Sequence, residues 1–175
     1  MTRFNDETRF LIDFNVHAVA SALGLPIPDE ATALIYGITP ADLAAYQAEI
    51  DGELRQSAMP FRDHAGVMAL AGLAGAGGRI LCLGDSITTY RRSYARMLPH
   101  LLAGVEVVNG GFSGYTSTHG LELTYTQFLA MQPSLVTISY GVNDCKQFDG
   151  SAVRPLVSAK EYAENLARIV QAFQK

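Results

Sequence analysis

The 175-residue sequence has only two cysteines and no long run of apolar residues. Cys82 and Cys145 lie in different predicted elements without the spacing of metal ligands, which favours reduced thiols and a cytoplasmic protein. No apolar run approaches the roughly 20 residues that span a bilayer. The N-terminus lacks the basic segment and following apolar segment of a secretory signal. A membrane protein and a disulfide-stabilised secreted domain are therefore not expected.

Charge is also sparse. The chain has 13 Lys and Arg against 17 Asp and Glu, a net charge of −4, and the basic residues are scattered. Such a pattern predicts neither a nucleic-acid partner nor an anionic membrane surface, so a small molecule is the expected partner. Hydrophobic residues make up 49% of the sequence, which is enough for the core of one domain, or of a small one plus part of another.

Residues 1–75 are predicted to be helical. Asn5 is placed to cap a first helix, which Gly24 would end. The clearest helix begins after Thr39, an N-cap residue that is followed by Pro40 at the first helical position. We expect these residues to form an N-terminal helical region.

A glycine cluster, Gly72–Gly78, follows this region. Glycine loops that bind dinucleotides follow a strand and open a helix, because the phosphate meets the helix N-terminal N–H groups. Here the glycines precede a predicted strand. The cluster is therefore interpreted as a flexible junction between residues 1–75 and a partial α/β domain over residues 76–175.

From Arg79 onward, short apolar segments alternate with amphipathic ones. Strands are expected over residues 79–83, 105–109 and 135–140. Ser158 and Glu161 form a capping box that begins the last helix. The order predicts an α/β fold with an incomplete, three-layer, flavodoxin-like parallel sheet of about three strands. The third strand would have an open apolar edge, which makes self-association through that edge an expectation.

Polar clusters follow all three predicted strands. They are Gly84-Asp85-Ser86, the segment Asn109–Thr116 and the segment Tyr140–Cys145. Ligands of open parallel sheets bind outside the carboxyl ends of the strands, so three clusters at consecutive strand ends can converge on one pocket.

These clusters resemble the sequence blocks of the SGNH, or GDSL-type, esterase and lipase family. Gly84-Asp85-Ser86 matches the first block, Gly114 the second and Gly141-Val142-Asn143-Asp144 the third, over roughly Arg79 to Gly150. The resemblance implies hydrolysis of a small-molecule carboxylic, acetyl or thioester through an acyl-Ser86 intermediate, without metal or cofactor. It also implies an oxyanion hole made by the N–H groups of Ser86 and Gly114 and by the Asn143 side chain.

The residue types suit these roles on physical grounds. Acyl transfer needs an oxygen nucleophile and fixed donors aimed at the developing oxyanion. Gly114 lacks a Cβ, so its N–H can approach the reacting centre, and Asn143 offers a neutral amide donor. The alternative for Ser86 is that it simply caps the following helix. Asp85 and Asp144 are interpreted as structural hydrogen-bonding residues.

Four further residues near the blocks have two interpretations each. Arg91 and Arg92 either meet an anionic substrate or, as we expect, lie on a solvated helix face. Tyr115 and Tyr140 either line the pocket or pack in the core or at its rim.

The general base that a serine nucleophile needs is missing. The family supplies it from a final Asp-x-x-His block, but here the last Asp is Asp149 and the last His is His119. Among the four histidines, His17, His64 and His100 are expected to be structural, and His119 is the only candidate near the correct rim. The sequence thus predicts a C-terminally truncated hydrolase with little turnover. A non-catalytic module that binds a carbohydrate, an acyl group or a protein on the same fold is the alternative.

Overall fold

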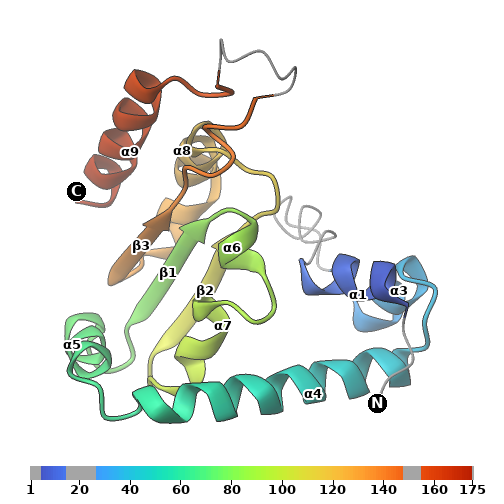
Figure 1. The fold of residues 1–175 in the computed structure, drawn as a ribbon. Helices are drawn as coiled ribbons and strands as arrows, with labels where there is room; N and C mark the ends of the chain where they lie inside the picture. The colour runs from blue at the N-terminus through green and yellow to red at the C-terminus, as the bar shows by residue number, and fades with distance from the viewer. Residues whose placement is uncertain (1–4, 15–26, 148–154, 175) are drawn as a thin grey trace.

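A computed structural model of the protein describes residues 5–14, 27–147 and 155–174. Three strands, β1 (Arg79–Gly84), β2 (Glu106–Gly111) and β3 (Leu135–Ser139), form a parallel sheet in the order β2-β1-β3 (Figure 1). This sheet and the helices around it confirm the predicted incomplete α/β fold. The second strand extends to Gly111, beyond its predicted end at residue 109. A Cβ at Gly110 or Gly111 would come too close to neighbouring atoms, so glycine allows the close packing at this end of the strand.

Helices cover both faces of the sheet, and successive residues of β1 face opposite layers, as the period of a strand requires. Leu81 and Leu83 pack with residues of α8 (Ser117–Leu123) and α9 (Ala159–Phe173). Ile80 and Cys82 pack with residues of α5 (Ala65–Ala74), α7 (Tyr94–Met97) and the 3-10 helix η2 (Leu98–His100). The result is the expected three-layer arrangement.

Burial differs between the central and the outer strands. β1 is buried from its second residue onward, whereas every residue of β3 is half-buried. β3 pairs with β1 on one side and with no other strand of the described residues. The open edge that the apolar sequence of β3 predicts is therefore present, and self-association through it stays a prediction.

The N-terminal helices form a hydrophobic cluster of their own. They are α1 (Asp6–Asp13), α3 (Asp29–Ile35) and the 19-residue α4 (Pro40–Ala58). Asn5 and Thr39 cap α1 and α4 as predicted. The first helix ends at Asp13, well before the predicted end at Gly24, which itself lies outside the described residues. Ile12, Leu43 and Tyr46 are fully buried in this cluster. No helix in the described ranges is long and apolar enough to cross a membrane.

The glycine cluster Gly72–Gly78 spans the end of α5 and the turn before β1. Gly75 ends α5 with a φ of 76°, a conformation that favours glycine. Ala71 and Ala74 of α5 pack in the same cluster as Ile80 of β1. The division of the chain at residue 75 stays a prediction, and α5 already belongs to a layer of the sheet.

Candidate active site

The three loops that carry the sequence blocks begin at one edge of the sheet. Gly84, the last residue of β1, is in register with Gly111 of β2 and Ser139 of β3. The Phe112 N–H donates to the Gly84 carbonyl at 3.1 Å, which extends the pairing into the second loop. We call the segments 85–93, 112–116 and 140–147 loops I, II and III.

In loop I, the helix cap is Asp85 and not Ser86. Asp85 is the N-cap of the short helix α6 (Ser86–Thr89), and its carboxylate accepts the Ile87 N–H at 2.9 Å. Ser86 is the first helical residue and is half-buried. Its hydroxyl makes no hydrogen bond to any of the residues that the structure describes. The capping role falls to Asp85, and the Ser86 hydroxyl is left without a structural partner there.

Loop II holds Gly114 in a conformation that other residues rarely adopt. Its φ is +80°, so any side chain at this position would be strained. Asn109, just before the end of β2, links loop I to β2: its side-chain N–H₂ donates to the Thr88 carbonyl at 2.9 Å and its side-chain oxygen accepts the Gly111 N–H at 3.0 Å. Asn109 belongs to the predicted polar cluster, but this role was not predicted.

Loop III is bonded directly to loop II. The Asn143 side-chain N–H₂ donates to the Tyr115 carbonyl at 3.0 Å, next to Gly114. An amide nitrogen has two N–H groups, so this bond leaves a second donor on Asn143. The structure therefore brings the second and third sequence blocks together at the sheet edge where the first begins.

Asp144 braces loop III, as expected. Its carboxylate accepts the Ser117 backbone N–H at 3.0 and 3.1 Å and also the Ser117 hydroxyl. Asn165 of α9 in turn donates to the Ser117 hydroxyl oxygen at 3.1 Å. The network connects loop III to α8 and α9. Asn165 was not predicted to belong to it, because it lies on a helix that is remote in sequence.

Negative charge accumulates beneath the loops. Burial, and secondly the charge of Asp144, raise the pKa of Asp85, although the Ile87 N–H opposes this. Burial, and then the charges of Asp85 and Asp144, raise the pKa of Tyr140. The buried Tyr140 hydroxyl has no hydrogen-bond partner among the described residues. Tyr140 is therefore a core residue, which decides between its two interpretations.

The histidines of the described ranges all have local structural partners. His119 Nδ1 accepts the Thr116 N–H at 3.1 Å and completes the capping box of α8. Since Nδ1 is the acceptor, neutral His119 carries its proton on Nε2 and has no free ring acceptor. His64 caps α5 through the Gly66 N–H at 3.1 Å, and His100 Nε2 lies 3.3 Å from Asp51. The fourth histidine, residue 17, lies outside the described residues.

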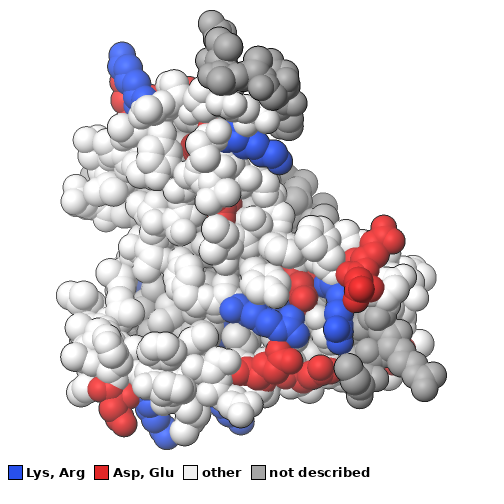
Figure 2. All heavy atoms as spheres, viewed as in Figure 1, with Lys and Arg blue, Asp and Glu red and all other residues white. Residues whose placement is uncertain are grey.

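The end of α1 docks on loops I and II. Arg92 pairs with Asp13 at 2.9 Å and with Glu53 of α4 at 2.7 Å, and Figure 2 shows acidic and basic side chains gathered over α4 and α7. The Phe14 ring stacks on Tyr90 at 4.9 Å, and the Phe14 carbonyl accepts the hydroxyl of Ser113 at 3.0 Å.

Arg91 also contacts this end of α1, because its Nε donates to the Ile12 carbonyl at 2.7 Å. Arg91 and Arg92 are half-buried. The prediction that they lie on a solvated helix face is therefore wrong. They contact α1, and nothing in the local sequence indicates that contact.

Four cavities that are lined by described residues do not include the central candidates. Their volumes are about 250 to 400 Å³, and Ser86, Gly114 and Asn143 line none of these four. One of about 310 Å³ lies beside loop III, between Asp144 and Tyr162. Within the described ranges, no three His, Cys, Asp or Glu side chains converge as metal ligands.

The comparison with protein families agrees with these strand-end blocks. The model of the GDSL-like Lipase/Acylhydrolase family matches residues 82–175, more than half of the chain. This chain belongs to the GDSL-like lipase and acylhydrolase family. The family match extends the resemblance beyond Gly150 and through α9. No curated protein and no solved structure matches the chain.

Proposed function

We propose that Ser86 is the nucleophile of a serine esterase, which hydrolyses a small-molecule carboxylic, acetyl or thioester. The observation that carries this proposal is the half-buried Ser86 hydroxyl, which has no structural partner among the described residues and sits at the sheet edge shared by loops II and III. Membership of an acylhydrolase family supports the reaction class.

In the proposed reaction, Ser86 Oγ attacks the ester carbonyl carbon while a base takes the hydroxyl proton. The carbonyl oxygen becomes an oxyanion, and the N–H groups of Ser86 and Gly114 and the second amide N–H of Asn143 donate to it. Collapse of the tetrahedral intermediate expels the alcohol or thiol and leaves acyl-Ser86. Water then attacks the acyl group and restores the serine.

The expected weakness is proton transfer. The histidines of the described residues are engaged at helix caps or with Asp51, and none hydrogen-bonds to Ser86. We infer that residues 1–175 alone turn over slowly, and that the oxyanion donors supply the residual rate, as they do when triad members are removed from serine hydrolases.

The test uses a fluorophosphonate probe and p-nitrophenyl acetate, each with and without added imidazole as an external base. We expect slow labelling of the protein that imidazole accelerates and Ser86→Ala abolishes. Ser134→Ala is the matched control, because this exposed hydroxyl lies at the opposite end of the sheet, beside the start of β3. Since imidazole itself cleaves the acetate, the rate is the difference between the wild type and Ser86→Ala.

The occupied histidines also favour a second candidate, a non-catalytic module that binds an acyl group or a carbohydrate on the same fold. The labelling test separates the two. Labelling equal in the wild type and in Ser86→Ala, with and without imidazole, would reject the esterase proposal and favour the binding module. Rapid Ser86-dependent turnover without imidazole would instead show that the chain contains its own base.

A further inference from the structure

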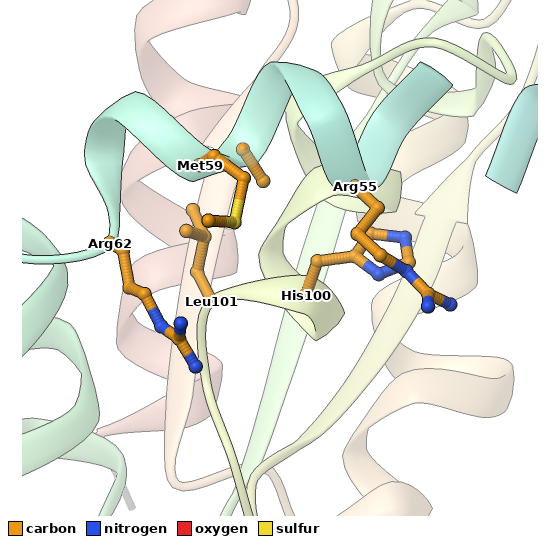
Figure 3. Close-up of a pocket in the computed structure, with 6 residues that line it drawn as sticks. Arg55, Met59, Arg62, His100 and Leu101 are labelled. Carbon is orange, nitrogen blue, oxygen red and sulfur yellow. The ribbon is translucent and has the colours of Figure 1, made fainter. Parts of the chain in front are cut away.

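Two cavities that share His100 are lined by residues of α4 and of the segment 91–101. The larger, of about 400 Å³, is lined by residues of α4 and by Arg91, Arg96 and His100. The smaller, of about 250 Å³, is also lined by His100 (Figure 3). In the smaller cavity, Arg62 lies to one side of Met59 and Leu101, whereas Arg55 and His100 lie to the other.

The larger cavity has more positive than negative charge. Asp51 is the one acidic residue among its lining residues, and it is already engaged: it lies 3.0 Å from Arg55 and 3.3 Å from His100. Neither Arg91 nor Arg96 forms an ion pair with an acidic side chain of the described residues, although the charge of Asp13 also acts on Arg91.

The two arginines have hydrogen-bonding groups to spare. Arg91 donates through Nε to the Ile12 carbonyl, and no described residue bonds its two terminal nitrogens. The Arg96 side chain bonds to none of the described residues. Burial, and secondly the charge of Arg96, lower the pKa of Arg91, so the two guanidinium groups repel each other. An anion between them would relieve that repulsion.

We propose that the larger cavity binds the phosphate group of a small molecule between Arg91 and Arg96, with the Gln47 side-chain amide as a neutral donor. Guanidinium groups present paired N–H donors that match phosphate oxygens in two-point contacts. Two positive charges suit a dianion better than a single carboxylate. A volume of about 400 Å³ is within the range of small-molecule pockets. The proposal is independent of Ser86.

The test is calorimetric titration of the 175-residue protein with inorganic phosphate near neutral pH, with chloride holding the ionic strength constant. We expect saturable binding that Arg96→Gln weakens by about tenfold or more, the loss of a charge-assisted contact. Arg96 is exposed and its side chain makes no hydrogen bond to the described residues, so this variant is expected to fold, which thermal melting checks. Arg96→Lys keeps the charge without the paired donors and is expected to bind at an intermediate level.

Arg62→Gln is the matched control, because Arg62 lines only the smaller of the two cavities. Phosphate binding that is lost in Arg96→Gln and kept in Arg62→Gln supports the proposal. Absence of saturable binding in the wild type, or equal loss in both variants, overturns it. Acetate binding as strong as phosphate binding overturns the assignment to a dianion.

Discussion

Asp85 of loop I and Asp144 of loop III are two buried aspartates with different surroundings. Their exposures are 1% and 3%; Asp85 directly follows β1, and Asp144 lies in the loop that follows β3. Asp144 accepts two kinds of donor from Ser117, whereas Asp85 accepts the single N–H of Ile87. Burial is the largest cause of the raised pKa of Asp85, and the hydrogen bond from Ile87 opposes it.

Loops I and III are held in place by different contacts. The hydrogen bonds among Asp144, Ser117 and Asn165 hold loop III against α8 and α9, which restrains the backbone of the neighbouring Asn143. Loop I has more hydrogen bonds within itself than loop III, and it is also bonded to α1 and α4 through Arg91 and Arg92. The loop that carries the proposed nucleophile is thus held by its own turns and by helices outside the sheet.

Removing the better-bonded carboxylate is expected to have the largest effect. Asp144→Ala leaves the buried Ser117 N–H and hydroxyl without their acceptor, and we expect a loss of about 2–4 kcal/mol in the free energy of unfolding. Urea denaturation measures it. Asp85→Ala, which strands one N–H at a helix cap, should cost no more than about 2 kcal/mol. Equal losses would show that the two carboxylates do not differ in their contribution to stability.

Tyr162 and Tyr140 also differ in how well their polar groups are hydrogen-bonded. Tyr162 of α9 donates to the Tyr140 carbonyl at 2.9 Å, whereas the buried Tyr140 hydroxyl has no partner among the described residues. Tyr162→Phe should cost about 1 kcal/mol. Tyr140→Phe should be neutral or stabilising, because it removes an unsatisfied buried hydroxyl. Thermal melting of both variants checks this, and a destabilised Tyr140→Phe would mean that the hydroxyl has a partner.

His119 tests whether loop II is supported in the manner of loop III. His119→Ala removes the acceptor of the Thr116 N–H at the start of α8, and we expect a loss of about 0.5–1 kcal/mol, typical of a capping residue. Fluorophosphonate labelling of Ser86 should not change beyond that loss of stability. If labelling disappears while the variant stays folded, His119 takes part in proton transfer.

The smallest expected change is in pH dependence. A carboxyl group whose pKa is raised on folding costs stability when ionised, so the Asp85 contribution improves as the pH falls from neutral toward its ordinary pKa of 3.8. Asp85→Asn cannot ionise but can still cap α6. Its unfolding free energy relative to wild type should be most favourable near neutral pH and should decline on acidification. A difference that does not vary with pH would contradict the raised pKa.

Local patterns in the sequence predicted the strands, the caps at Asn5 and Thr39, and the shared edge of the three blocks. They could not predict the Asp144–Ser117–Asn165 network, since its two bonded pairs are 27 and 48 residues apart and none of the three residues is unusual in its own segment. The docking of α1 was missed for the same reason. Helical periodicity says which face of a helix is apolar, not which distant loop its last carbonyls meet.

The contacts of α1 with loops I and II have a kinetic consequence. The bonds from Arg91 and Ser113 to the end of α1 close chain separations of 79 and 99 residues. Contacts between residues so far apart in the chain form late in folding, because the chain entropy that is lost when they form must be compensated by other contacts. We expect the sheet to form first and loop I to gain its outer support last. In the refolding protein, protease sensitivity in loop I should outlast that in loop III.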